Sequence, residues 1–316
     1  MSNVSYTPVW ATLVNRSLRM VGAYDAGKTP TSQQLQDALA VLNMMLKEWQ
    51  VDNPLWLKTF ATLFLNTGQQ SYNLANIAAG GNHCATSYIQ TTLANSIIAG
   101  ANSAVLTSAA GMANTNYLGI ADNNGLIEWF TATFSGATAT LSSTMAVAAT
   151  AGNVVYYHTL SSQIERPTRV MTAVRKLYDP IAANGIEVEI ELYSRAEYSY
   201  MPNKTVTGKV VQAYYDPQLN AGVLYTWPTA DTPNDKLVLT VDRPILVPSI
   251  DTDMLDVPQE WQDPITFCLA ERMWWEYPDS GANYNLLQQR AILGKQAVFD
   301  YDREPAASQY QFDMRR

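Results

Sequence analysis

Residues 22–29 carry the one motif in the chain that would hold a nucleotide phosphate. They match the phosphate-binding loop pattern, two glycines with four residues between them followed by Lys28 and Thr29. Such a loop cradles phosphates only where it follows a strand and opens a helix. Here the preceding residues have a helical pattern, and Pro30 disfavours helical geometry at Thr29. Residues 237–242, an apolar run ending in an acid, lie in a β-rich region without the alternating helices of a nucleotide site, so we predict no nucleotide binding.

Nucleophilic catalysis is a second candidate chemistry, because a thiolate beside a histidine is a strong nucleophile. The chain has two cysteines, Cys84 and Cys268, and two histidines, His83 and His158. A catalytic pair drawn from His83, Cys84 and His158 is one alternative. The favoured interpretation is two reduced, unreactive cysteines in a protein made in a cytoplasm. Because the cysteines are too few and too far apart for a metal cluster, we predict no metal, no cofactor and no catalytic residue.

Carboxylates are the remaining candidates, since glycoside hydrolysis needs two acids about 5 to 10 Å apart in a cleft. One group alternates along a predicted strand, as expected of a solvated strand face: Glu187, Glu189 and Glu191. Another lines a loop and offers oxygen ligands of the kind that Ca²⁺ prefers, without the spacing of a known loop: Asp251, Asp253 and Asp256. We therefore expect a protein that is not an enzyme.

Composition limits the classes of partner. Of the 316 residues, 47% are hydrophobic and only 15% are charged, which argues against disorder. The net charge of −8 makes affinity for a DNA backbone a poor first hypothesis. The chain has no run of about 18 apolar residues that would span a membrane and no secretory signal at its N-terminus. We expect a protein made in the cytoplasm and soluble there.

The elements that would position these residues follow from periodicity. Apolar residues spaced by three and four predict helices over residues 7–22, 32–51, 259–276 and 284–301, with a short helix over 194–200. Alternating segments predict strands at 59–65, 70–74, 88–92, 104–107, 117–121, 126–134, 138–141, 154–158, 169–178, 186–192, 207–214, 223–227 and 236–241. The predicted fold class is α+β: helical hairpins from both chain ends packed with a central antiparallel β region, plus an inserted all-β module.

A change in composition predicts the domain organisation. Residues 84–158 contain no Lys or Arg and are rich in Ala, Ser, Thr, Asn and Gly. We predict an inserted β-sandwich or barrel-like module at 83–159, a core formed by 1–82 and 160–316, and an extended arm at 303–316. The module offers stacking platforms for a sugar in Trp129, Tyr156 and Tyr157, so glycan binding stays an alternative.

Several segments in order carry a family resemblance. They are Ser17-Leu18-Arg19-Met20-Val21-Gly22, Gly27-Lys28-Thr29-Pro30-Thr31, Asp37-Ala38-Leu39, Leu42-Asn43, Met45-Leu46, Trp49, Leu224-Tyr225-Thr226-Trp227-Pro228, Leu237-Val238-Leu239, Pro244, Asp256-Val257-Pro258-Gln259-Glu260-Trp261 and Leu269-Ala270-Glu271. Over residues 8–82 and 160–316 the chain resembles head-to-tail adaptor proteins of short-tailed bacteriophages, also called tail accessory factors or packaged-DNA stabilisation proteins. A Gly-x-Pro-Ser/Thr link between the first two helices is an ordinary feature of that family.

The resemblance implies a structural virion protein at the head–tail junction, assembled in the host cytoplasm. Its subunits would form a homo-oligomeric connector ring of twelve copies that extends and seals the DNA channel after packaging, until ejection. Its partners would be the portal protein and tail nozzle or tail fibre proteins, with double-stranded DNA passing without specific binding and no membrane involved. The alternatives are a peptidoglycan-degrading tail enzyme and a glycan- or receptor-binding tail module.

The resemblance also implies roles for particular residues. The arm would dock on the portal through apolar anchors and cations: Tyr310, Phe312, Met314, Arg315 and Arg316. The aromatic and Met content of the helices suits packing between subunits or on the portal: Trp10, Met45, Trp49 and Trp261, with Met20, Met44 and Trp56 nearby.

Overall fold

The computed structural model describes residues 9–25, 27–52, 54–177, 185–249, 253–277 and 283–302. The chain divides into two compact units, residues 1–57 with 245–316 and residues 58–244, which we call the helical unit and the β unit. The predicted domain boundaries at 82/83 and 159/160 both fall inside the β unit.

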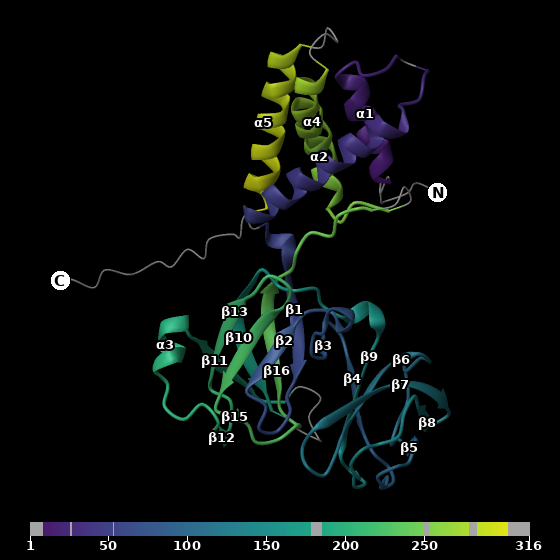
Figure 1. Ribbon diagram of the computed structural model, residues 1–316, viewed down its shortest axis with the longest axis vertical. Helices are drawn as coiled ribbons and strands as arrows, with labels where there is room; N and C mark the ends of the chain where they lie inside the picture. The colour runs from purple at the N-terminus through teal and green to yellow at the C-terminus, as the bar shows by residue number, and fades with distance from the viewer. Residues whose placement is uncertain are drawn as a thin grey trace, which may run out of the picture. The chain divides into compact units, whose positions relative to one another are not determined.

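The described residues of the helical unit form four α-helices, α1 (Trp10–Met20), α2 (Ser32–Val51), α4 (Gln262–Met273) and α5 (Tyr284–Tyr301) (Figure 1). Helix α2 begins at a capping box, in which the Thr31 hydroxyl accepts the Gln34 N–H at 3.2 Å and the Gln34 side chain accepts the Thr31 N–H at 2.8 Å. Helix α4 packs against α1, α2 and α5. No helix in the described part of the chain is long and apolar enough to cross a bilayer.

The core of the helical unit is aromatic and is formed by that unit alone. The ring of Trp261 lies 5.8 Å from that of Trp49 and 4.8 Å from that of Phe299, both edge-on. Apolar residues of all four helices surround these rings, with Leu57 and Ile245 at the two places where the chain passes to the β unit. The apolar faces of the helices therefore pack against one another.

The β unit is built on an eight-stranded sheet with the strand order β2-β14-β13-β11-β10-β16-β1-β3. Its strands are β1 (Lys58–Phe64), β2 (Ser71–Leu74), β3 (Cys84–Ala85), β10 (Arg169–Lys176), β11 (Glu187–Leu192), β13 (Gln212–Pro217), β14 (Gly222–Trp227) and β16 (Lys236–Asp242). All neighbours pair antiparallel except β11 and β13, which run parallel. A pair formed by β12 (Thr207–Gly208) and β15 (Thr229–Ala230) and a short helix α3 (Arg195–Tyr200) complete this part.

A second, six-stranded sheet with the order β4-β9-β6-β7-β8-β5 is antiparallel throughout. Its strands are β4 (Ile89–Thr92), β5 (Ser103–Val105), β6 (Asn116–Ala121), β7 (Ile127–Ser135), β8 (Thr138–Leu141) and β9 (Val154–His158). Its own core contains Leu118, Ile120, Phe130 and Tyr157. Single 3₁₀ turns are η1 (Leu55–Leu57), η2 (Ile77–Ala79), η3 (Leu160–Ser162), η4 (Gln259–Trp261) and η5 (Trp274–Glu276).

The predicted fold class is wrong. The described residues form sixteen strands and only five α-helices, so the protein is mostly β rather than helical hairpins around a β region. The predicted packing of the helices on a central antiparallel β region also fails, because the helices bury their apolar faces in their own core. The central sheet is not purely antiparallel, since β11 and β13 pair in parallel at Glu191↔Gln212 and Leu192↔Ala213.

Candidate functional site

The phosphate-loop motif does not form a phosphate cradle. It follows helix α1 rather than a strand, and its two glycines adopt left-handed φ values of 70° at Gly22 and 89° at Gly27. The Lys28 ammonium lies 2.5 Å from the carboxylate of Asp25 in the same loop. Asp242, the acid of the proposed partner strand, lies in the other unit. The loop therefore works as a turn between α1 and α2.

The two histidines meet although they lie far apart in the sequence. His83 Nδ1 is 2.9 Å from His158 Nε2, and the His83 ring stacks on Trp129 with a centroid distance of 3.8 Å and an interplanar angle of 6°. Burial lowers the pKa of His83 to about 3, with the neighbouring His158 acting in the same direction. Burial lowers the pKa of His158 as well. Both rings are therefore neutral near pH 7.

Neither cysteine has the surroundings of a nucleophile. Cys84 is 2% exposed, and burial raises the pKa of its thiol far above the usual range. Burial also raises the pKa of Cys268, to about 11. A reactive cysteine needs a lowered pKa and access to solvent, and Cys84 has neither. In the predicted Cys–His alternative, the two histidines therefore pair with each other, while the Cys84 thiol is buried in the core of the eight-stranded sheet.

The acidic candidates have local structural partners. Glu187, Glu189 and Glu191 are exposed along β11, which confirms the predicted solvated strand face. In the loop before α4, Asp253 accepts the Ser249 N–H at 2.8 Å and Asp256 accepts the Leu246 N–H at 3.0 Å. Asp251 lies outside the described residues. Within the described ranges, no three His, Cys, Asp or Glu side chains gather as metal ligands.

The predicted contact residues separate into two groups. Those proposed to pack between subunits lie in the core of the helical unit, at most 3% exposed: Trp10, Met45, Trp49 and Trp261. Side chains this deeply buried belong to the core and leave almost no area exposed for contact with another subunit. The proposed arm lies outside the described residues: Tyr310, Phe312, Met314, Arg315 and Arg316. Of the three proposed sugar platforms, Tyr156 and Tyr157 are buried and Trp129 is half-buried against His83.

Exposed apolar residues of the helical unit include two sets that each lie on one helix. On α2 the exposed residues Ala40, Met44 and Val51 follow one another at intervals of four and seven, and we call them the α2 stripe. On α5 the exposed residues Leu286, Leu293, Ala297 and Tyr301 are spaced by seven, four and four, and we call them the α5 stripe. Such spacings place side chains on one helix face.

Both stripes are much more exposed than core residues. Met44 and Leu293 are each 63% exposed and Tyr301 is 83% exposed. The buried faces of the same helices carry a separate set of residues, such as Leu42 on α2 and Leu287 on α5. Each helix is thus apolar on two sides. A helix with apolar residues outside its core face exposes a second apolar surface. Exposed apolar patches of this kind mark interaction sites.

The ends of the two helices are tied together within the helical unit. The Lys295 ammonium lies 3.0 Å from the Asp52 carboxylate, just after α2, and the Leu55 N–H donates to the Asp302 carboxylate at 2.6 Å, just after α5. The C-terminal ends of α2 and α5 therefore meet, as Figure 1 shows. A groove of about 320 Å³ between α2, α4 and α5 is lined by Trp49, Cys268 and Ile292 and by the ion pair of Glu48 with Arg272, 2.7 Å apart.

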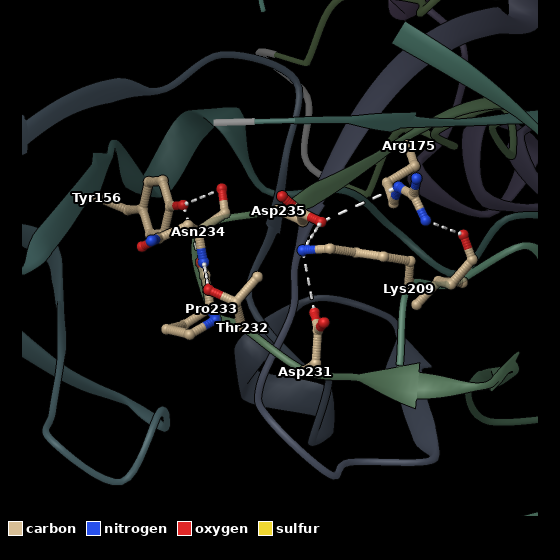
Figure 2. Close-up of polar contacts among 9 residues, drawn as sticks. Tyr156, Arg175, Lys209, Asp231, Thr232, Pro233, Asn234 and Asp235 are labelled. Atoms are coloured by element: carbon tan, nitrogen blue, oxygen red, sulfur yellow. Dashed lines mark hydrogen bonds and ion pairs between the residues drawn. The ribbon is translucent and has the colours of Figure 1, made fainter. Parts of the chain in front are cut away.

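Within the β unit, a polar network fixes the six-stranded sheet to the eight-stranded one through the loop 231–235 (Figure 2). Tyr156 of β9 donates to the main-chain oxygen of Pro233 at 2.9 Å. On the other side of the loop, Asp235 lies 3.2 Å from the Lys209 ammonium and 3.9 Å from the Arg175 guanidinium. Lys209 also lies 3.1 Å from Asp231.

A second contact reinforces this junction. Lys236 of β16 donates to the side-chain oxygen of Gln90 in β4 at 2.6 Å and lies 5.1 Å from the centre of the Tyr156 ring. Burial lowers the pKa of Lys236 to about 8. The rings of Phe64 and Tyr156 lie 4.7 Å apart in an apolar cluster that both sheets share. The two sheets therefore hold one another in a defined orientation.

Comparison with known proteins identifies no family: no family model matches the chain, and no curated protein matches it either.

Proposed function

We propose that this protein is a ring subunit of a bacteriophage head-to-tail adaptor, which joins the portal to the tail and performs no catalysis. The observation that carries the proposal is the pair of exposed apolar stripes on α2 and α5. Identical subunits that associate head to tail need two different, complementary surfaces on each copy, and such contacts close into a ring when the rotation permits. A chain with two separate apolar stripes on one unit meets that requirement.

The segments behind the family resemblance support the same proposal. Ser17-Leu18-Arg19-Met20-Val21-Gly22 spans the end of α1, and the Asp37, Leu42 and Trp49 segments lie on α2. Asp256-Val257-Pro258-Gln259-Glu260-Trp261 leads through η4 into α4. Most of the motif residues therefore belong to the unit that carries the stripes.

The charge of the chain suits a channel through which DNA slides. Each copy carries a net charge of −8, which a ring multiplies. An acidic lining repels phosphate and limits sticking, because a DNA-binding surface gains affinity by neutralising phosphates with Lys and Arg. Double-stranded DNA would then pass without specific binding.

The test is binding to portal rings purified from the phage that encodes this chain. The full chain and a version ending at Asp302 are incubated with the rings, sedimented and imaged by negative stain. We expect the full chain to add a second annulus of density and the shortened chain to bind weakly or not at all, since it lacks Tyr310, Phe312 and Met314. Failure of the full, folded chain to bind at any concentration would contradict the proposal. Binding by the shortened chain would refute only the role of residues 303–316.

A further inference from the structure

We propose that the α5 stripe of one copy packs on the α2 stripe of a second copy of this chain, with Arg290 of one copy opposite Asp37 of the other. This contact deepens the proposed function and rests on it, because it names the surfaces by which neighbouring ring subunits would meet. Both surfaces are exposed in the single chain: Met44 and Leu293 each keep 63% of their accessible area.

The register follows from the spacing of the residues. On α2, Asp37, Ala40 and Met44 are separated by three and four positions, and on α5 Arg290, Leu293 and Ala297 have the same separations. When the two helices run in the same direction, the small Ala40 faces the large Leu293 and the large Met44 faces the small Ala297. Alternation of large and small side chains lets facing helices interdigitate.

Charge selects the parallel direction. In the parallel register the Asp37 carboxylate faces the Arg290 guanidinium, a favourable pair at the edge of the contact. In the antiparallel register Ala40 faces Ala297, Met44 faces Leu293, and Asp37 then falls opposite Asp300, so that two carboxylates meet. Like charges across an interface disfavour that arrangement.

The two stripes lie on helices that meet at their C-terminal ends, through the Lys295–Asp52 ion pair and the bond from the Leu55 N–H to Asp302. The direction of α5 on α2 of the next copy is set by the Asp37–Arg290 register alone.

Mixed disulfide trapping tests the contact directly. Ala40→Cys and Leu293→Cys are made in separate chains, mixed at high protein concentration and oxidised. Because the native Cys84 and Cys268 are buried, they contribute little background. We expect a disulfide-linked dimer in the mixture and not in either variant alone, and a ladder of higher species when one chain carries both changes. Thr12→Cys, exposed on α1, replaces Ala40→Cys as the matched control and should give no dimer.

A charge exchange tests the register. Asp37→Arg and Arg290→Asp should each reduce the yield of mixed disulfide by up to about fivefold, and the two together should restore it. Circular dichroism confirms that each surface variant is folded. Absence of a mixed disulfide in folded variants would overturn the inference, as would a dimer from Leu293→Cys alone, which would show a symmetric contact.

The portal assay separates the two proposals. If portal rings bind the full chain and no Ala40–Leu293 disulfide forms there, the ring stands and this interface is wrong. If the disulfide forms but portal rings bind nothing, the self-contact stands and the adaptor function is wrong.

Discussion

The hydroxyl of Tyr156 donates to the main-chain oxygen of Pro233 across 2.9 Å, and this contact connects β9 of the six-stranded sheet to the loop that leads into β16. The same hydroxyl lies 3.2 Å from the oxygen of Asn234. Tyr156 is completely buried, so its ring packs in the cluster between the sheets while its polar end meets the loop.

Tyr156→Phe removes this bond while keeping the ring. We expect the free energy of unfolding of the β unit to fall by about 0.5 to 1.5 kcal/mol, because the partly buried Pro233 oxygen loses its hydroxyl donor. Urea denaturation followed by tryptophan fluorescence measures the change. Tyr200→Phe is the control, since Tyr200 is 85% exposed and should have no measurable effect. Equal stability of the two variants would show that the bond does not hold the sheets together.

Asp235→Ala tests the buried ion pair. Asp235 and Arg175 are 7% and 9% exposed, and removal of the acid leaves the Arg175 guanidinium without its anion. Breaking a buried pair in this way destabilises a protein by about 3 to 5 kcal/mol. Asp263→Ala is the comparison, because the Asp263–Arg16 pair is exposed and worth at most about 1 kcal/mol. Similar losses for both variants in a denaturation experiment would contradict this account.

The histidine pair predicts acid sensitivity. The pKa of His83 falls from 6.5 in the unfolded chain to about 3 in the folded one, so the unfolded state binds more protons between those pH values. His83 therefore costs no stability above pH 6.5. As the pH falls from 6.5 toward 3, this group lowers the free energy of unfolding by at most about 1.4 kcal/mol per pH unit. Thermal unfolding from pH 7.5 to 3.5 measures this slope.

His83→Gln should reduce the slope without abolishing it, because the pKa of His158 is lowered too. Acidic side chains titrate equally in both proteins, so the difference between the two curves isolates the histidine. If the two curves ran parallel throughout the acid range, His83 would not be responsible.

Thr31→Ala tests the start of α2. The change removes the hydroxyl that accepts the Gln34 N–H, and a lost N-cap costs about 1 kcal/mol. We expect faster hydrogen exchange at the first turn of α2 and a small decrease in the stability of the helical unit. Thr29→Ala, two residues earlier and also exposed, is the matched control and should leave exchange in α2 unchanged.

Local periodicity predicted individual elements well. The predicted helix at 32–51 coincides with α2, because its capping residue and its buried stripe are both local signals. The predicted strands at 138–141 and 154–158 coincide with β8 and β9. Turn residues and alternation over a few positions were sufficient for these elements.

Properties that depend on distant segments were not predictable in the same way. His83, which precedes β3, meets His158 of β9 where the two sheets pack against each other, and no signal near either residue indicates this contact. Tyr156 was one of three predicted sugar platforms, yet a second sheet covers it. The predicted fold class was wrong because it gave the helices at the chain ends too much weight, whereas most of the described elements are strands.

The exposed stripes were also missed, although their signal is present in the sequence. Met44 and Val51 lie outside the face that Leu42, Met45 and Trp49 define, and a wheel of α2 would have separated the two faces. Met44 was predicted only as a neighbour of the contact residues Trp10, Met45, Trp49 and Trp261, which are large side chains that the core buries.

Strands β1 and β16 begin and end the β unit, and they pair from Lys58↔Asp242 to Phe64↔Lys236. The chain thus leaves the helical unit and returns to it along two adjacent strands, about 5 Å apart. At the helical end of this pair, Lys58 lies opposite Asp242, so the two connections to the helical unit start from neighbouring positions. The β unit is thus one continuous insertion between the two halves of the helical unit, so a β unit of another size could replace it without changing the sequence of the four helices.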